Sequence, residues 1–302
     1  MHVRFWGTRG SLPSSLTARQ VRTKLVRAIG SARGRDLATA EAIEAFLDHE
    51  LPFSVSGTYG GNTPCVEIGD QPDYLICDAG TGLRDFGNGW LRSARGTAPA
   101  VFHLFLSHLH WDHIQGFPFF VPAYRGGNTV HVYSCHPDAE KALVNQQAAP
   151  YFPVPFAELG AKILFHTLEP GRSYELAGYC VRAIAQNHPG DSYGYSFIRE
   201  GRKFVYSTDM EHGPEAQNQG YAFVDFYRGA DLLVCDAQYS LADAIGSKET
   251  WGHSSNVLAV ELAVQAGVKR LCLFHTEPTR DDEAMDRFLD ETREYLKIYD
   301  PG

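Results

Sequence analysis

The sequence predicts a mixed α/β fold in which helices cover two central β-sheets. Three observations lead to this class. Short apolar runs of strand length recur along the chain, several neighbouring runs are separated only by turn residues, and segments with helical spacing lie between other runs. In a doubly wound fold, parallel strands are connected through helices. Strands joined directly as hairpins are antiparallel, so this pattern favours two mixed sheets over a doubly wound sheet.

The strands are predicted from apolar runs bounded by turn residues. Residues 2–6 form the first of them. The run 101–106 is typical of a strand that is buried on both faces. The runs 64–68 and 74–77 are separated by a Gly-Asp-Gln-Pro turn, which indicates a hairpin. Further strands are expected at residues 130–134, 162–168, 179–186, 194–199, 203–207, 232–235 and 270–274.

Helices are predicted between these strands, at residues 83–93, 137–148, 255–266 and 281–296. Residues 17–50 differ from the rest, because Ala, Arg and Glu dominate and helical spacing appears. Within them, the run 37–51 carries one apolar side, formed by Leu37, Ala40, Ile43, Leu47 and Leu51. We interpret residues 15–52, with approximate bounds, as a helical insertion in a single domain of residues 1–302. A lid, a dimer surface and plain packing are all open roles for it, and packing or dimerisation is favoured.

Composition limits the class of protein. A chain of 302 residues, 44% of them hydrophobic, can bury one large core. Its net charge of -9 disfavours a general nucleic-acid binder, which needs a basic face, although bound cations can dominate a local field. The six cysteines form no C-x-x-C pair and are expected to be buried, reduced thiols. No signal-peptide pattern and no apolar run of membrane-spanning length is present, so a cytoplasmic protein is expected.

The segment Ser107-His108-Leu109-His110-Trp111-Asp112-His113 is the main chemical signal. It places three imidazoles and one carboxylate directly after the apolar run 101–106. Such side chains are ligands for zinc, manganese and iron. His108 and His110 alternate along extended chain and point the same way, whereas Asp112 and His113 lie past a turn and can face a second ion. The disfavoured alternative is a cluster of hydrogen-bonded histidines in the core. Burying so many polar side chains directly after a buried strand is costly unless a specific interaction, such as metal binding, compensates for it.

The pattern His108-x-His110-x-Asp112-His113 resembles the signature of the metallo-β-lactamase superfamily. The resemblance implies a four-layer αβ/βα sandwich with two divalent metal ions at one edge of its sheets. These N and O ligands suit Zn²⁺ or Mn²⁺, and iron is possible. Four further positions match the family's motifs, each at or just beyond the end of an apolar run. They are Asp78 as a structural carboxylate, His188 as a ligand of the first metal, Asp209 as a bridging carboxylate, and His275 as a ligand of the second metal.

Departures from other branches narrow the resemblance. True β-lactamases generally do not use the position of Asp112 for the second metal, and flavodiiron oxidoreductases carry a carboxylate where His110 stands. A bridging Asp209 is typical of glyoxalase II-like thioesterases and ribonuclease Z-like phosphodiesterases. Two segments favour the phosphodiesterases, because residues 232–237 and 251–255 resemble the ribonuclease Z segments that supply a carboxylate and its partner histidine.

Those segments imply a pair formed by Asp236 and His253, in which the carboxylate orients the imidazole and favours its cationic form. His253 would then bind the phosphate and protonate the leaving alkoxide as the general acid, while a metal-bridging hydroxide attacks phosphorus. The predicted catalytic residues are Asp112, Asp236 and His253. The alternative for His253 is a residue at a helix start. Asn62 and Thr63, in Gly-Gly-Asn-Thr-Pro, are predicted to contact substrate together with His253, or else to be simple turn residues.

The predicted function is a phosphodiesterase acting on a small phosphodiester such as a cyclic nucleotide. The aromatic run 117–120, with residues 151–153, forms either a base pocket or core. Ribonuclease Z itself fits less well, because the Gly- and basic-rich arm that grips tRNA has no counterpart between His188 and Asp209. Three alternatives remain: a thioesterase or lactonase with the same metals, a ribonuclease Z-like RNA endonuclease, and a non-catalytic metal-bound sensor. A homodimer is possible, whereas membrane and nucleic-acid partners are not expected.

Overall fold

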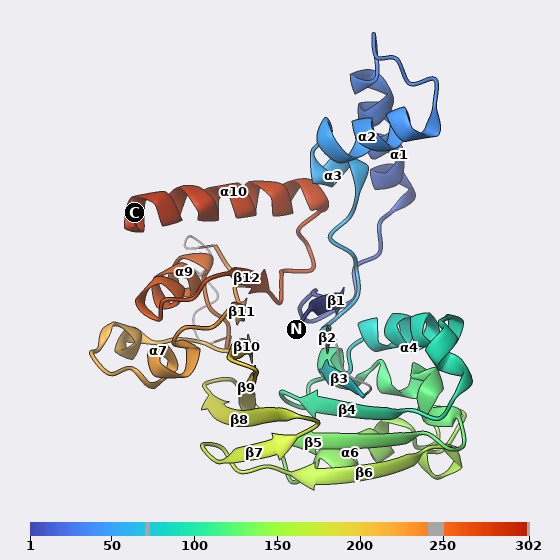
Figure 1. Cartoon of the computed structure of the whole chain (residues 1–302), viewed down its shortest axis with the longest axis vertical. Coiled ribbons are helices and arrows are strands. Elements are labelled where there is room, and N and C mark those ends of the chain that lie inside the picture. The colour runs from blue at the N-terminus through green and yellow to red at the C-terminus, as the bar shows by residue number, and fades with distance from the viewer. Residues whose placement is uncertain (70–72, 241–250, 301–302) are drawn as a thin grey trace.

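The computed structural model describes residues 1–69, 73–240 and 251–300. In these residues twelve strands form two six-stranded sheets, and Figure 1 shows helices outside both. The predicted mixed α/β class is therefore confirmed. The first sheet has the order β1 (Val3–Gly7), β2 (Cys65–Ile68), β3 (Tyr74–Cys77), β4 (Val101–Leu106), β5 (Thr129–Ser134), β6 (Lys162–Thr167). The second has the order β12 (Leu271–Phe274), β11 (Leu232–Asp236), β10 (Arg202–Ser207), β9 (Ser192–Arg199), β8 (Tyr179–Gln186), β7 (Ser173–Leu176).

Strand direction decides where the polar residues gather. Strands β3, β4, β5 and β6 run parallel to one another, as do β10, β11 and β12. Strand β8 points the same way as β10, because both are antiparallel to β9. The carboxyl ends of β8, β10, β11 and β12 therefore meet at one edge of the second sheet. The predicted hairpin of β2 and β3 is antiparallel as expected, and most of its turn lies outside the described residues.

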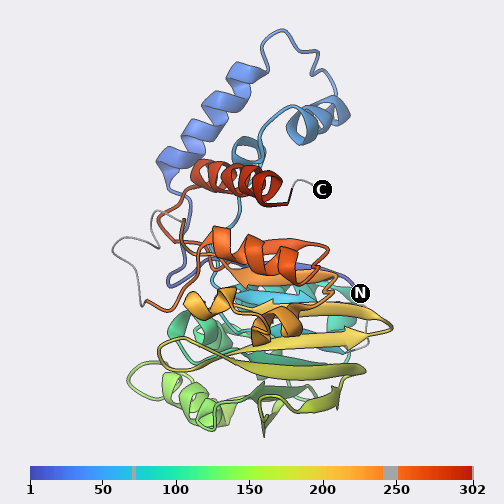
Figure 2. The ribbon, with the colours of Figure 1, turned by 90° about the vertical axis from the view of Figure 1, so that its left-hand side faces the viewer.

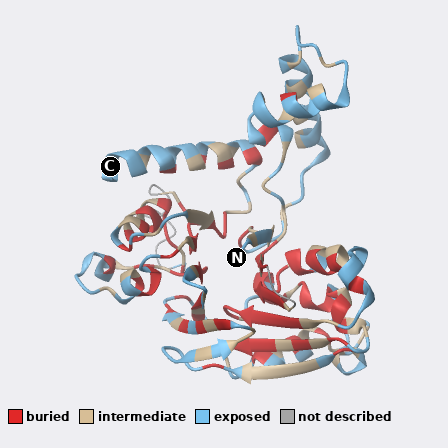
Figure 3. Ribbon diagram, viewed as in Figure 1, coloured by how far each residue is buried: buried red, intermediate tan, exposed pale blue. Residues whose placement is uncertain are grey.

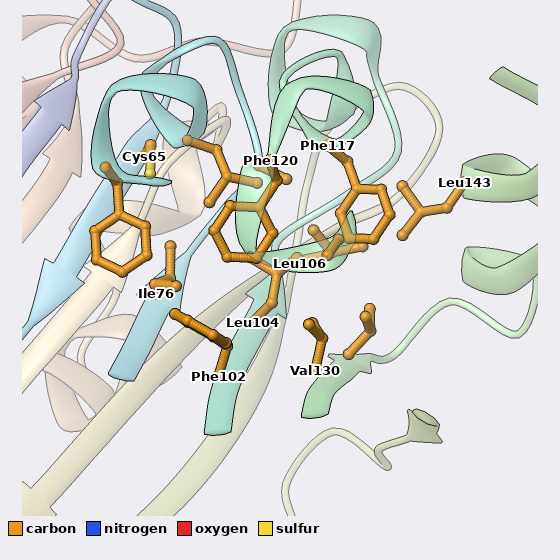
Figure 4. Close-up of a cluster of buried hydrophobic side chains, with 14 of the residues drawn as sticks. Cys65, Ile76, Phe102, Leu104, Leu106, Phe117, Phe120, Val130 and Leu143 are labelled. Atoms are coloured by element: carbon orange, nitrogen blue, oxygen red, sulfur yellow. The ribbon is translucent and has the colours of Figure 1, made fainter. Parts of the chain in front are cut away.

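Three apolar layers hold the sheets and helices together. The middle layer joins the inner faces of the two sheets, with Phe105 and Tyr133 of the first sheet against Phe197 and Tyr206 of the second. An outer layer packs α4 (Gly82–Arg92) and α6 (Ala139–Gln146) on the first sheet (Figure 4). The other outer layer packs α7 (Ala222–Tyr227), α9 (Asn256–Gln265) and α10 (Asp282–Tyr299) on the second. This arrangement is the expected αβ/βα sandwich, and Figure 3 shows inner strands such as β4 and β5 largely buried, whereas β6 and β7 are intermediate or exposed.

Residues 15–52, which we interpret as a helical insertion, contain α1 (Ala18–Ser31) and α2 (Ala40–His49), and α3 (Phe53–Ser56) follows them. All three helices lie between β1 and β2. Helix α1 starts with a capping box, in which the Thr17 hydroxyl accepts from the Gln20 amide and the Gln20 side chain accepts from the Thr17 amide. The predicted helix over residues 37–51 was too long, because Thr39 caps α2 and fixes its start at Ala40. Both main helices project away from the two sheets (Figure 2).

Other expectations hold with small differences at element ends. All six cysteines are free, and four of them are buried, as expected. Strand β7 and the short helices α3 and α7 were not predicted. Their runs of four to six residues are too short for a clear periodic pattern. No helix in the described residues is both long enough and apolar enough to cross a membrane.

Candidate metal centre

The polar residues predicted from sequence gather at the carboxyl edge of both sheets. Asp78 follows β3, the His108–His113 segment follows β4, and His188, Asp209 and His275 follow β8, β10 and β12. The Tyr193 amide donates to the Ser107 carbonyl at 2.9 Å and so ties the two edges together.

One group of possible ligands consists of His108, His110 and His188, whose ligand atoms all lie within 4.8 Å of one another. His110 Nδ1 lies 3.2 Å from His188 Nε2. The opposite nitrogen of His188, Nδ1, lies 2.8 Å from the Gly252 carbonyl oxygen and donates to it. This bond fixes the tautomer and leaves the Nε2 lone pair directed at the group.

A second group consists of Asp112, His113 and His275, again with ligand atoms within 4.8 Å. His275 Nε2 lies 3.0 Å from Asp112 Oδ2 and 3.2 Å from His113 Nε2. The far nitrogens of both rings have acceptors, because His113 Nδ1 lies 2.7 Å from Asp78 Oδ2 and His275 Nδ1 lies 3.1 Å from Gln238 Oε1. Both rings therefore turn Nε2 toward the centre.

Asp209 lies between the two groups. Its Oδ1 is 3.2 Å from His113 Nε2, and its Oδ2 is 3.3 Å from His275 Nε2 and 3.6 Å from His108 Nε2. The Asp209 backbone has φ 49°, in the left-handed region that non-glycine residues rarely adopt. Asp78 and His275 share this feature, with φ 62° and 55°. Backbone strain of this kind is typical of functional sites, where surrounding structure holds side chains in required positions.

The donor atoms fit two divalent ions. The His108 Nε2 atom is fully buried and has no hydrogen-bond partner among the described residues, which is costly for a polar atom unless an ion satisfies it. Imidazole nitrogens also face one another at hydrogen-bond distance, as between His113 and His275. A set of five imidazoles and two carboxylates matches the ligand preferences of zinc and manganese.

The charges of the group are strongly coupled. Burial disfavours the charged form of Asp112, but His113 and His275 outweigh it and hold the pKa of this carboxyl well below its usual range. Burial opposes a charge on His113 as well, yet the carboxylates of Asp209, Asp112 and Asp78 raise its pKa well above the ordinary value. Burial and the neighbouring His113 lower the pKa of His108. In the absence of metal, these carboxylates therefore favour the protonated form of His113.

Loading metal-free protein with zinc at pH 7 is therefore expected to release at least about one proton per chain, because a ligating imidazole must be neutral. Isothermal titration calorimetry in buffers of different ionisation enthalpy measures this release. An apparent binding enthalpy that is the same in every buffer would contradict a protonated His113.

Asp236 and His253 form the predicted pair beside this centre. His253 Nδ1 lies 2.7 Å from Asp236 Oδ2, and the His253 ring stacks on the His275 ring with centroids 4.8 Å apart. Burial lowers the pKa of His253, but the Asp236 carboxylate overcomes this and raises it to about 9. Asp236 also accepts from the backbone amides of Asp209 and Ser254, so it is held from several sides. Ser255 caps α9, so His253 does stand near a helix start.

Three residues that support the centre, Gly10, Ser11 and Gln238, were assigned no role there from the sequence. The Ser11 amide donates to Asp112 Oδ2 at 2.8 Å, and Gly10 is so close to His275 that a Cβ there would lie 2.6 Å from its ring. Gln238, which orients His275, also received no role. The Arg-Gly-Ser motif at residues 9–11 was visible in the sequence, whereas Gln238 carries no local signal beyond its place after β11.

Asn62 and Thr63 lie in a loop that braces the segment after β3. Asn62 Nδ2 donates to Asp85 Oδ2 at 2.7 Å, and Thr63 Oγ1 accepts from the Thr81 amide at 2.8 Å and from Gln115 Nε2 at 3.2 Å. Thr63 is fully buried. These bonds favour the structural alternative for the loop, and its contact with substrate stays a prediction.

The predicted aromatic wall divides between core and surface. Phe117 and Phe120 are buried in the outer layer of the first sheet (Figure 4), where Phe120 packs against Phe102 of β4 and Phe86 of α4. Phe119 is exposed and meets Phe152 edge to face at 5.5 Å, and Tyr151 is exposed as well. The run 117–120 is therefore not a continuous pocket wall.

Comparison with known proteins defines the class that the fold and site indicate. Residues 74–276, two thirds of the chain, match the model of the beta-lactamase superfamily domain. The chain belongs to the metallo-β-lactamase superfamily and is a metal-dependent hydrolase. The family resemblance carried by the His108–His113 segment is thus confirmed.

Several individual proteins are similar to this chain. The chain is 25% identical over 282 residues to a ribonuclease Z of Haloarcula marismortui. The aligned region covers 77% of this chain and 86% of the relative. Its fold is similar to that of the metallo-β-lactamase-fold protein YhfI from Bacillus subtilis, with TM-score 0.62, 17% identity and coverage of 98% and 91%. It is also similar to the short form of human tRNase Z, with TM-score 0.59, 19% identity and coverage of 92% and 93%.

Proposed function

We propose that this chain is a dinuclear metal-dependent phosphodiesterase that hydrolyses a small phosphodiester such as a cyclic nucleotide. The observation that carries the proposal is the pair of Asp236 and His253, 2.7 Å apart, beside the two ligand groups. A cationic imidazole next to two metals suits a phosphodiester, whose non-bridging oxygens are anionic and whose leaving group needs a proton. A carboxyl ester or thioester offers no such anion to bind.

Seven residues hold the metals in this proposal. His108, His110 and His188 would hold the first ion, and Asp112, His113 and His275 would hold the second. Asp209 contacts residues of both groups and would be a ligand that the two ions share. Zn²⁺ is the first choice, with Mn²⁺ and iron as candidates. When bound, two such ions supply Lewis acidity and an activated water for attack on phosphorus.

The protein's own residues do the rest. Because Nδ1 of His253 is held by Asp236, its Nε2 proton is the one that faces the phosphate and then the leaving oxygen. As the bond from the attacking hydroxide to phosphorus forms and the bond from phosphorus to the leaving oxygen breaks, His253 would transfer this proton to the alkoxide and become neutral. Asp236 holds the ring in this orientation through Nδ1 and stabilises its cationic form. Asp112 is the third predicted catalytic residue, and the Ser11 amide fixes its carboxylate.

Replacing Asp236 with asparagine is expected to move the alkaline limb of the kcat profile to lower pH. The acid must be protonated to act, so activity falls as pH rises through the pKa of His253. Asp236 raises that pKa, and its removal lowers it. The measurement is kcat against pH at saturating substrate, with metal content checked at each pH. An unshifted limb in Asp236→Asn would remove Asp236 from the mechanism.

Exposed aromatic side chains beside the centre support a substrate that contains a base. Trp111, next to ligand candidate His110, is 81% exposed, and Trp251, two residues before His253, is 60% exposed. His110 contacts His188, which in turn bonds to Gly252, so each tryptophan stands next in sequence to a residue of this contact chain. Large exposed rings in such positions suit stacking on a nucleobase.

An RNA endonuclease of the ribonuclease Z type is the second candidate, because the Haloarcula marismortui relative carries that name. Against it, strands β9 and β10 and their short connections occupy residues 188–209, so no long tRNA-gripping arm lies between His188 and Asp209. A thioesterase or lactonase is the third candidate. Residence in the cytoplasm, a single domain over residues 1–302 and a homodimer also stay predictions.

A substrate panel tests the proposal. Metal-loaded protein is offered 3′,5′-cyclic AMP and cyclic GMP, bis(p-nitrophenyl) phosphate, a precursor tRNA with a 3′ extension, a thioester and a lactone. We expect turnover of the phosphodiesters, with the cyclic nucleotides best. Preferred turnover of the thioester or lactone would refute the phosphodiesterase, and preferred cleavage of the tRNA would establish the second candidate.

A further inference from the structure

Helices α1 and α2, with α3 at their base, form a helical arm (residues 17–56) that projects from the sandwich in both views (Figures 1 and 2). The arm precedes residue 74, where the superfamily match begins. The superfamily match therefore assigns no role to the arm, and its role is inferred from its own surface residues.

The inner side of α1 is polar. Lys24 Nζ donates to the Gly57 carbonyl at 2.6 Å and lies 2.6 Å from Asp282 Oδ2 at the start of α10. Arg27 pairs with Glu283 at 3.1 Å. Gln20 and Lys24 are also less exposed than the residues around them. Charged groups and hydrogen bonds, rather than apolar packing, thus attach α1 to the body.

The apolar side of α1 faces away from the body. Val21, Leu25, Val26 and Ile29 are 43%, 58%, 61% and 71% exposed, and α1 has no buried residue. Val21, Leu25 and Ile29 recur every four residues and so form one stripe along the helix. An amphipathic helix in a folded protein normally turns this side to the core, and a stripe left outside marks an interaction site.

Charge on the arm is divided between its two helices. Arg19 and Arg22 are exposed on α1 beside the apolar stripe, and the only charged residues of α1 are basic. Helix α2 buries Phe46 and exposes carboxylates on its opposite side, at Glu41, Glu44 and Asp48. One arm therefore carries both a basic surface and an acidic surface, which makes it complementary to a second copy of itself.

We propose that the helical arm is a dimerisation device, in which the apolar stripe of α1 packs on the same stripe of a second copy of this chain. In a two-fold contact every pairing occurs twice, once in each direction across the axis. The basic side of α1 in each copy would therefore face the acidic side of α2 in the other copy. The acidic α2 disfavours RNA or an anionic membrane as the occupant, because both would approach Glu41, Glu44 and Asp48.

Analytical ultracentrifugation of the metal-loaded full chain tests this proposal. We expect a dimer in the micromolar range for the native sequence, and a monomer for the double variant Leu25→Asp/Ile29→Asp. Ile298→Asp is the matched control, because Ile298 is 79% exposed on α10, outside the arm. It should stay dimeric. All variants should keep the far-ultraviolet circular dichroism of the native chain, since the replaced side chains are exposed.

A charge exchange tests the pairing itself. Arg22→Glu and Glu44→Arg should each weaken the dimer, and a mixture of the two variants should form heterodimers more readily than either forms homodimers. A native chain that is monomeric throughout, or a dimer that survives Leu25→Asp/Ile29→Asp, overturns the proposal. So does a monomer that sediments with RNA or with anionic vesicles through α1.

Discussion

Replacing Asp209 with alanine is expected to reduce hydrolysis of bis(p-nitrophenyl) phosphate to the uncatalysed background. Among the carboxylates of the described residues, Asp209 is the one that reaches both ligand groups, through contacts of 3.2 Å to His113 and 3.6 Å to His108. Without it, five imidazoles and Asp112 face one another with less compensating negative charge, so the centre should hold fewer than about two metal ions per chain. Inductively coupled plasma mass spectrometry gives the metal content beside the rate.

The matched control is Asp225→Ala, because Asp225 is an exposed aspartate on α7 and takes no part in the centre. It should keep both metal and activity. His110→Ala is expected to behave like Asp209→Ala, with loss at the first group. Native turnover in either ligand variant would refute the assignment of the metal centre.

Replacing His253 with glutamine is expected to lower kcat by about 10²–10⁴-fold while the metal content stays native, because general acid catalysis contributes on this scale. His253 belongs to the pair with Asp236 and is not one of the seven proposed ligands. The loss should depend on the leaving group. p-Nitrophenolate departs without much help from an acid, whereas the ribose alkoxide of a cyclic nucleotide needs its proton.

Rates for both substrates, measured on His253→Gln and native protein side by side, check this dependence. His49→Gln is the matched control, because His49 is exposed on the helical arm. Equal losses for both substrates would argue that His253 only binds phosphate, and native rates for both would remove it from the reaction.

Much of the centre was predicted through the resemblance of the His108–His113 segment and of four further positions to the superfamily's motifs, and strand topology explains why these positions meet. His188, Asp209 and His275 lie far apart in the chain, yet each follows an apolar run, and carboxyl ends of like-directed strands meet at one edge. The segment from His108 to His113 also predicted a metal site by itself, because it holds four residues of metal-ligand type within six positions.

Contacts made by the backbone could not be predicted in the same way. The Ser11 amide bonds to Asp112 across about a hundred residues of chain, and no side-chain pattern encodes a backbone donor. The direction of the amphipathic helix α1 also needed the structure. Periodicity identifies an apolar side, but only the contacts of Lys24 and Arg27 show that this side faces away from the body.

The central claim is that two metals, held by seven side chains at the joined sheet edges, carry out the hydrolysis. The most direct test is to strip the protein of metal, restore one metal at a time in measured equivalents, and follow bis(p-nitrophenyl) phosphate turnover against bound metal. We predict no turnover in the stripped protein and full turnover only when about two ions are bound per chain. Full turnover by metal-free protein, or two ions bound without turnover of any phosphodiester, would contradict the claim.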